Sequence, residues 1–139
     1  MLTSDSFAEP PHLERLGHRD PHIRFQAISA TVASLGAAVC ALRHHAPEEE
    51  FAAYAYAVDA ATHAATILEL PAAPPLVFPS LSAAQTNALA ETVTVASIRL
   101  SRALLALAAE EHDAEQQLKM SQAAASLAEV HYWLASDDE

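Results

Sequence analysis

Glycine, cysteine and basic residues are scarce in this 139-residue sequence, which has two glycines, one cysteine and seven lysines and arginines. The single cysteine, Cys40, excludes a disulfide scaffold. Gly17 and Gly36 are too few for a glycine-rich phosphate loop or for the tight turns of an all-β fold. Eighteen acidic residues give a net charge of −11, and because such a surface repels phosphate, we expect no nucleic-acid partner.

Alanine is abundant, with 33 copies in a chain that is 52% hydrophobic. This content excludes intrinsic disorder and favours helices, because alanine has the best helix propensity. The first residues, 1–6, lack the basic start and apolar run of a signal peptide, so we expect a cytoplasmic protein. The uncharged segment 25–42 is rich in alanine and small polar residues and falls short of the roughly 20 strongly apolar residues of a membrane span, so we expect a buried helix and no membrane insertion.

Caps and prolines divide the sequence into helices. Asp20 followed by Pro21 is a helix N-cap with proline at the first helical position, and Pro47 separates two helices. The four prolines of segment 71–79 exclude a helix and predict an extended crossover. Residues 82–85 form a capping box, and Asp113 caps a further helix. We therefore expect helices over about 21–45, 47–70, 82–112 and 114–135, after an irregular N-terminal arm at 1–19.

Each expected helix carries apolar residues at alternating spacings of three and four, the pattern of a seam between nearly parallel helix axes. In the second helix this seam consists of Phe51, Tyr54, Val58, Ala61, Ala65 and Leu68. The connections near residues 46 and 113 are so short that the helices they join must be antiparallel neighbours. We predict an all-α fold, an antiparallel up-down-up-down four-helix bundle at 20–139, in which a Pro-rich crossover joins two helical hairpins.

The outer faces of the first and third helices carry apolar side chains where a bundle helix normally has charges. Helix propensity alone explains alanines on these faces, but it does not explain the larger side chains. A large apolar patch is unusual on a monomer in water. We therefore expect a homo-oligomer, with a dimer as the expected state, and an interface that includes Ala30, Ala33, Ala37, Val95, Ile98 and Leu105.

Histidines and acids cluster at the tips of the two helical hairpins, which the predicted topology places at the same end of the bundle. Imidazole and carboxylate groups are ligands of zinc and other divalent ions. Helix capping explains the same residues without a metal, because acids belong at helix N-termini and histidines at C-termini. The candidate metal ligands are His44, His45, Glu48, Glu111, His112 and Asp113.

Asp59 and His63 lie four residues apart and therefore share one face of the second helix. A carboxylate beside an imidazole orients the ring and raises its basicity, as a general base requires. With His131 of the fourth helix, these two residues are the candidate catalytic groups. The alternative interpretation is that both histidines are ordinary solvated surface residues.

Aromatic residues indicate a second kind of site, a small-molecule pocket between helices. The candidate ligand-binding residues are Tyr56, Phe78, Tyr132 and Trp133. The alternative is that Trp133, the single tryptophan, packs against the crossover near Phe78.

Two functions fit these patterns. The first is a non-enzymatic cytoplasmic bundle that self-associates and serves as an interaction or scaffold module. The alternative is a small-molecule- or metal-binding bundle, including an accessory enzyme that uses Asp59, His63 and His131. No cofactor is predicted, and the patterns do not decide whether the protein is an enzyme, because bundles host many unrelated activities.

Overall fold

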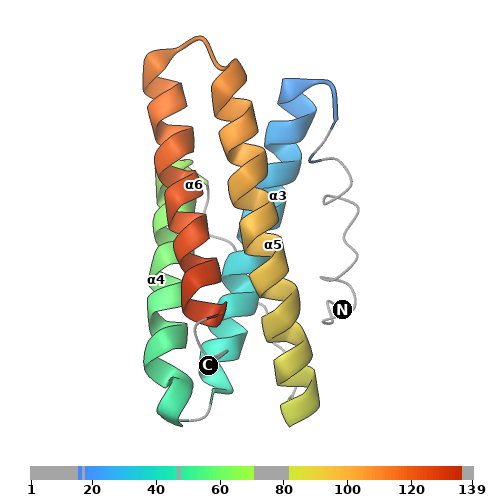
Figure 1. Cartoon of the computed structure of the whole chain (residues 1–139), viewed down its shortest axis with the longest axis vertical. Helices are drawn as coiled ribbons and strands as arrows, with labels where there is room; N and C mark the ends of the chain where they lie inside the picture. The colour runs from blue at the N-terminus through green and yellow to red at the C-terminus, as the bar shows by residue number, and fades with distance from the viewer. Residues whose placement is uncertain (1–15, 17, 47, 71–81, 136–139) are drawn as a thin grey trace.

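A computed structural model of the chain describes residues 16, 18–46, 48–70 and 82–135 (Figure 1). These residues form four long α-helices and a short 3-10 turn, with no strand among them. The all-α fold class and the packing of four helices against one another are therefore confirmed. Most of the predicted N-terminal arm and the Pro-rich segment 71–79 lie outside the described residues.

α3 spans Pro21–His44 and begins at the predicted cap. The Asp20 carboxylate accepts a hydrogen bond from the backbone N–H of His22 at 2.9 Å, which satisfies one of the free donors of the first turn. Pro21 follows the cap, where its fixed φ angle suits the helix and its missing N–H costs nothing. The sequence therefore sets the start of this helix through local chemistry alone.

α4 is shorter than the predicted second helix. Glu48–Glu50 form the 3-10 turn η2, and α4 covers Phe51–Ile67 with no side-chain cap at its start. At its end, the backbone N–H of Leu70 donates to the carbonyl of Ala65, and Glu69 adopts a φ of 58°. This Schellman-type ending normally uses glycine, and a side chain in the left-handed region costs about 1 kcal/mol.

The third and fourth long helices are α5, Ala83–Glu110, and α6, Ala114–Ala135. The predicted capping box is present at the start of α5: Ser82 Oγ accepts from the N–H of Gln85 at 3.1 Å, and the Gln85 side chain accepts from the N–H of Ser82 at 2.9 Å. Asp113 precedes α6, and its carboxylate accepts a backbone hydrogen bond of 2.9 Å from the first turn. Side-chain caps therefore begin both helices.

The four helices form a ring in which α3 and α6 each pack against both α4 and α5. In Figure 1, α3 and α6 run downward while α4 and α5 run upward, so every neighbouring pair is antiparallel. Two ion pairs agree with these directions. Arg24 at the start of α3 lies 2.7 Å from Glu110 at the end of α5, and Glu69 beyond α4 lies 2.9 Å from Lys119 near the start of α6.

The predicted up-down-up-down order is therefore wrong. If the direction of α3 is taken as up, the helices run up-down-down-up in chain order. The end of α4 and the start of α5 lie at opposite ends of the bundle (Figure 1). Roughly 15 residues separate Ile67 from Ala83, and an extended chain of that length reaches about 50 Å. This reach exceeds the length of α5, about 42 Å at 1.5 Å per residue, so the connection does not force α4 and α5 to be antiparallel.

A single core fills the space between the helices. α3, α5 and α6 contribute leucine, isoleucine and valine at their predicted seams, whereas α4 contributes Tyr54 and alanines. The predicted α4 seam is wrong in detail, because Phe51 is half exposed and Val58 is only partly buried. Small side chains let neighbouring helices approach closely, so the buried stripe of α4 follows its alanines. These are Ala57, Ala60, Ala61 and Ala64.

Candidate functional site

The antiparallel packing of α4 and α6 brings most of the predicted catalytic and ligand-binding residues to one side of the molecule. We call this side the α4–α6 face. The start of α4 lies beside the end of α6, and the end of α4 lies beside the start of α6 (Figure 1). The contacts that define the face involve Tyr56, His63, Glu69, Lys119, Ser126, Tyr132 and Trp133. Asp59 belongs to the face by its four-residue spacing from His63.

Three of the four predicted ligand-binding aromatics meet on this face. Tyr56 stacks on Trp133 with 4.6 Å between ring centroids and 24° between ring planes. Tyr132 contacts the same indole edge-to-face at 5.2 Å. The fourth candidate, Phe78, lies outside the described residues. The exposed rings of Tyr56 and Tyr132 therefore flank a partly buried indole that already has aromatic partners.

The three predicted catalytic residues do not converge. His63 and Asp59 are exposed on α4, and the hydrogen-bond partner of the His63 ring is Ser126, whose Oγ lies 3.4 Å from Nδ1. His131 lies on another side of α6, where its Nδ1 is 3.0 Å from the carbonyl oxygen of Thr94 on α5. Because a carbonyl only accepts, this contact assigns the His131 proton to Nδ1. The structure therefore does not bring His63 and His131 together, and each ring has its own partner.

An exposed ion pair lies at the end of the α4–α6 face where α4 ends and α6 begins. Lys119 Nζ donates to Glu69 Oε2 at 2.9 Å. This hydrogen bond, together with the charge of the ammonium group, lowers the pKa of the Glu69 carboxyl. The same interaction raises the pKa of Lys119. The pair links the end of α4 to the beginning of α6 across the surface of the bundle.

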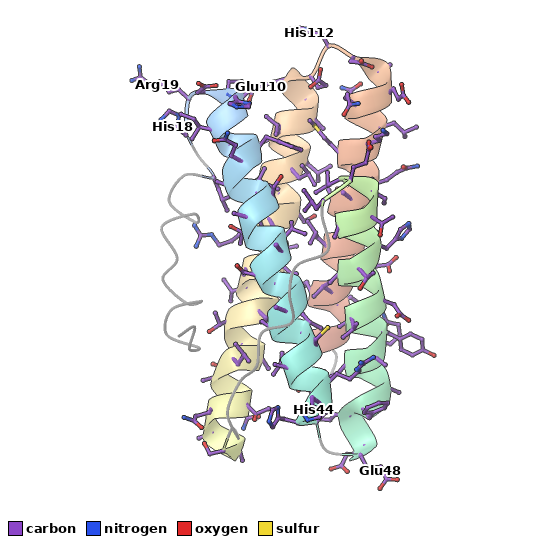
Figure 2. The ribbon with its side chains drawn as sticks, turned by 180° about the vertical axis from the view of Figure 1, so that it is seen from behind. His18, Arg19, His44, Glu48, Glu110 and His112 are labelled. Atoms are coloured by element: carbon purple, nitrogen blue, oxygen red, sulfur yellow. The ribbon has the colours of Figure 1, made fainter. Side chains whose placement is uncertain are left out.

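The predicted metal ligands fall into two groups at opposite ends of the bundle, which contradicts the expectation that the hairpin tips share one end. Figure 2 shows His44 and Glu48 at one end and His112 at the other. The up-down-down-up order is the cause, because α3–α4 and α5–α6 turn at opposite ends. Across the described ranges, no group of three or more His, Cys, Asp or Glu side chains is arranged to hold a metal ion.

Several of these tip residues instead satisfy the backbone of the helix ends. His45 Nδ1 lies 2.9 Å from the carbonyl oxygen of Ala41 at the end of α3. Glu111 Oε1 accepts from the backbone N–H groups of His112 and Asp113, each at 3.1 Å. The capping interpretation of the tips is the one that these contacts support.

The outer face of α5 carries the predicted apolar interface residues. Val95 is 56% exposed and Leu105 is 50% exposed, while Ile98 is partly buried. They belong to one row of residues at alternating spacings of three and four, which we call the α5 stripe. Its members are Ala84, Ala88, Glu91, Val95, Ile98, Arg102, Leu105 and Ala109, and all except Ile98 are exposed.

The corresponding alanines of α3 differ from this stripe. Ala30, Ala33 and Ala37 are only partly exposed, so α3 offers less open apolar surface than α5. The sequence interpretation of α5 named only its apolar members and missed Glu91 and Arg102. Glu91 and Arg102 can be found from the sequence by their spacing. They continue the alternating steps of three and four residues along the outer side of the helix, as core residues do along its inner side.

α3 and α5 are also long and apolar enough to cross a membrane by length and composition. Half of the apolar window of α3 and 44% of that of α5 are buried inside the bundle. The core helix of a water-soluble bundle has the same properties, so this finding is weak support for a membrane span.

The chain matches no protein-family model, and no curated protein or solved structure is significantly similar to it.

Proposed function

We propose that this protein is a non-enzymatic helical bundle that self-associates through the α5 stripe and serves as an interaction or scaffold module. The observation that carries the proposal is the exposure of Val95 and Leu105 in one row with Ile98. Burial of apolar surface is favourable by about 25 cal/mol per Å², and a second copy of the chain offers the same row. A dimer with a two-fold axis is the commonest assembly that buries one patch against itself.

The test is the mass of the protein in solution, measured by light scattering during size-exclusion chromatography. We expect a dimer for the wild type and a monomer for Leu105→Glu. The substitution buries two unpaired carboxylates in each dimer, which raises the dissociation constant by about a hundredfold or more. Helix content measured by circular dichroism stays unchanged, because Leu105 is half exposed in the single chain.

Leu118→Glu is the matched control, because this leucine is 58% exposed on α6 and lies away from the α5 stripe. It should leave the dimer intact. A monomeric wild type overturns the proposal. A dimer that Ala37→Glu dissociates and Leu105→Glu does not would move the contact to α3 and overturn the assignment to α5.

The proposal includes a cytoplasmic location and excludes nucleic-acid and membrane partners. Its support is the net charge of −11, which disfavours binding to phosphate, and the burial of α3 and α5 side chains in the core. A homo-oligomer is the proposed assembly, and a further protein partner would bind to the assembled form.

A second candidate function, small-molecule binding, is favoured by one observation on the α4–α6 face. The stacked pair Tyr56–Trp133 lies on the same face as the exposed His63 and Asp59, so apolar surface and hydrogen-bonding groups occur side by side. Native mass spectrometry after incubation with a metabolite extract tests it. Mass retained on the chain supports ligand binding, and a chain of bare polypeptide mass contradicts it.

A further inference from the structure

We infer that two copies of the chain pair through their α5 stripes in an antiparallel register, with a two-fold axis that passes between Ala96 and Ser97. This inference rests on the proposed self-association and adds its geometry. The stripe residues repeat at alternating spacings of three and four, as the contacts between two helices with nearly aligned axes do. A straight row of this kind suits another helix as its partner.

The proposed axis gives every stripe residue a complementary neighbour. Residues at equal distances from the axis face each other, so Val95 packs against Ile98 of the partner subunit. Glu91 then lies opposite the partner's Arg102, and symmetry repeats this ion pair on the other side of the axis. Further out, small Ala88 lies opposite the partner's Leu105, and Ala84 lies opposite the partner's Ala109. In this register the largest exposed apolar side chain of the stripe, Leu105, faces a small residue, and each charge faces its opposite.

Other arrangements leave charges unpaired or opposed. A parallel pairing places Glu91 against the partner's Glu91 and Arg102 against the partner's Arg102, and like charges in an interface are costly. Moving the antiparallel register by one heptad places Glu91 opposite Ala109 or Val95 of the partner subunit, so that no basic residue of the stripe faces it. A buried carboxylate without a partner is unfavourable. Charge complementarity therefore selects one register.

Glu91 and Arg102 are available for such contacts. Both are exposed, and neither forms an ion pair or side-chain hydrogen bond with another residue in the part of the chain that the structure describes. They lie eleven positions apart on the same helix, about 16 Å at 1.5 Å per residue, which is too far for them to pair with each other. Only another molecule can bring these two charges together.

The experiment measures the dimer dissociation constant by sedimentation equilibrium for the wild type, Glu91→Arg, Arg102→Glu and the double variant that carries both changes. Each single change replaces two attractive contacts by two repulsive ones, so the dissociation constant rises about tenfold or more. The double variant restores both ion pairs with their signs reversed and returns to within about threefold of the wild type. An equimolar mixture of the two single variants forms a heterodimer, because both of its ion pairs are attractive.

The change in net charge distinguishes the loss of the Glu91–Arg102 ion pairs from a general repulsion between two acidic chains. Glu91→Arg makes the acidic chain less negative, so weaker association runs against the change in overall charge. Glu129→Arg is the matched control, because it makes the same charge change at an exposed position of α6 and should not weaken the dimer.

Two outcomes overturn the inference, and a vesicle assay refines the second. If Leu105→Glu dissociates the dimer but the single charge changes do not weaken it, the register is wrong and the proposed self-association stands. If the wild type is a monomer at all concentrations, both the register and the proposed self-association are wrong. If that monomer also floats with vesicles of phosphatidylcholine and phosphatidylglycerol, lipid and not a second copy covers the stripe.

Discussion

The α4–α6 face and the α5 stripe differ in how many of their exposed groups find partners within the chain. On the α4–α6 face, Tyr56 stacks on Trp133, His63 lies near Ser126, and Lys119 pairs with Glu69. On the α5 stripe, Glu91 and Arg102 have no ion-pair partner within the described ranges. A group that is satisfied inside its own chain gains little from a second molecule.

If the protein self-associates as proposed, chemically conspicuous residues are a poor guide to its functional surface. The α4–α6 face collects the aromatic rings, a histidine and an exposed aspartate, which are the residue types that binding sites use. Its contacts nevertheless join α4 and α6 within one chain. The α5 stripe is plainer, but Glu91 and Arg102 have no ion-pair partner among the described residues, and the proposed dimer supplies one for each.

The largest expected effect is a difference in the free energy of unfolding between substitutions on the two sides of α5. Leu104 is fully buried, whereas its neighbour Leu105 is half exposed. We expect Leu104→Ala to lower the free energy of unfolding by about 3 kcal/mol, and Leu105→Ala to lower it by less than about 1 kcal/mol. Urea denaturation at concentrations low enough to keep the protein monomeric measures both.

The same pair should behave in the opposite way in the dimer assay, where Leu105→Ala weakens association and Leu104→Ala leaves the contact surface intact. Equal losses of folding stability for the two variants would mean that the α5 stripe belongs to the fold of the single chain. The comparison between the two faces would then fail.

A smaller effect concerns the aromatic contact of the α4–α6 face. In a double-mutant cycle of Tyr56→Ala and Trp133→Ala, we expect a coupling free energy of about 1 kcal/mol, because stacked rings gain this much beyond the area they bury. Thermal or urea unfolding of the four proteins provides the measurement. Phe51→Ala is the control partner, since Phe51 is an exposed aromatic of α4 that should show no coupling to Trp133. Additive losses for Tyr56 and Trp133 would contradict the contact.

The smallest effect is the pH dependence of the exposed pair Glu69–Lys119. The lowered pKa of Glu69 means that its contribution is present above the ordinary value of 4.5 and is lost as the pH falls through the folded pKa. The raised pKa of Lys119 means that the contribution persists below 10.5 and is lost as the pH rises through the folded pKa. Glu69→Gln should therefore slightly lower unfolding stability at pH 7.

The difference between the wild type and Glu69→Gln should disappear in acid well below pH 4.5, and it should shrink in high salt because exposed ion pairs are screened. Denaturation curves at both pH values and two salt concentrations measure it. If the stability difference persists in acid, its cause is the backbone conformation at residue 69 and not the charge of Glu69.

Local signals in the sequence predicted much of the fold. Asp20, Ser82 and Asp113 cap helices as expected, because a cap depends only on residues within one turn. The seams of α3, α5 and α6 are dominated by large side chains, so their spacing identifies the buried faces. α4 is alanine-rich on several sides, so its spacing leaves the buried face ambiguous, and close packing decides it.

The order of the helices and the candidate sites depended on distant contacts, which the sequence does not encode locally. The length of the connection between α4 and α5 permits either direction for α5. The predicted placement of both hairpin tips at one end of the bundle relied on one of those directions. The grouping of His63 with His131 as candidate catalytic residues relied on the rotation of their helices. Tyr56 and Trp133 meet for the same kind of reason, through the antiparallel register of α4 and α6.

The antiparallel ring of helices has a consequence for the meeting of two copies in solution. Each helix reverses the peptide dipoles of its neighbours, so the four dipoles largely cancel and the field around the molecule comes from its side chains. With a charge of −11, two copies repel each other before their surfaces touch. Dissolved ions shorten the range of this repulsion, so the rate of encounter follows the ionic strength of the surroundings, whatever the strength of the final contact.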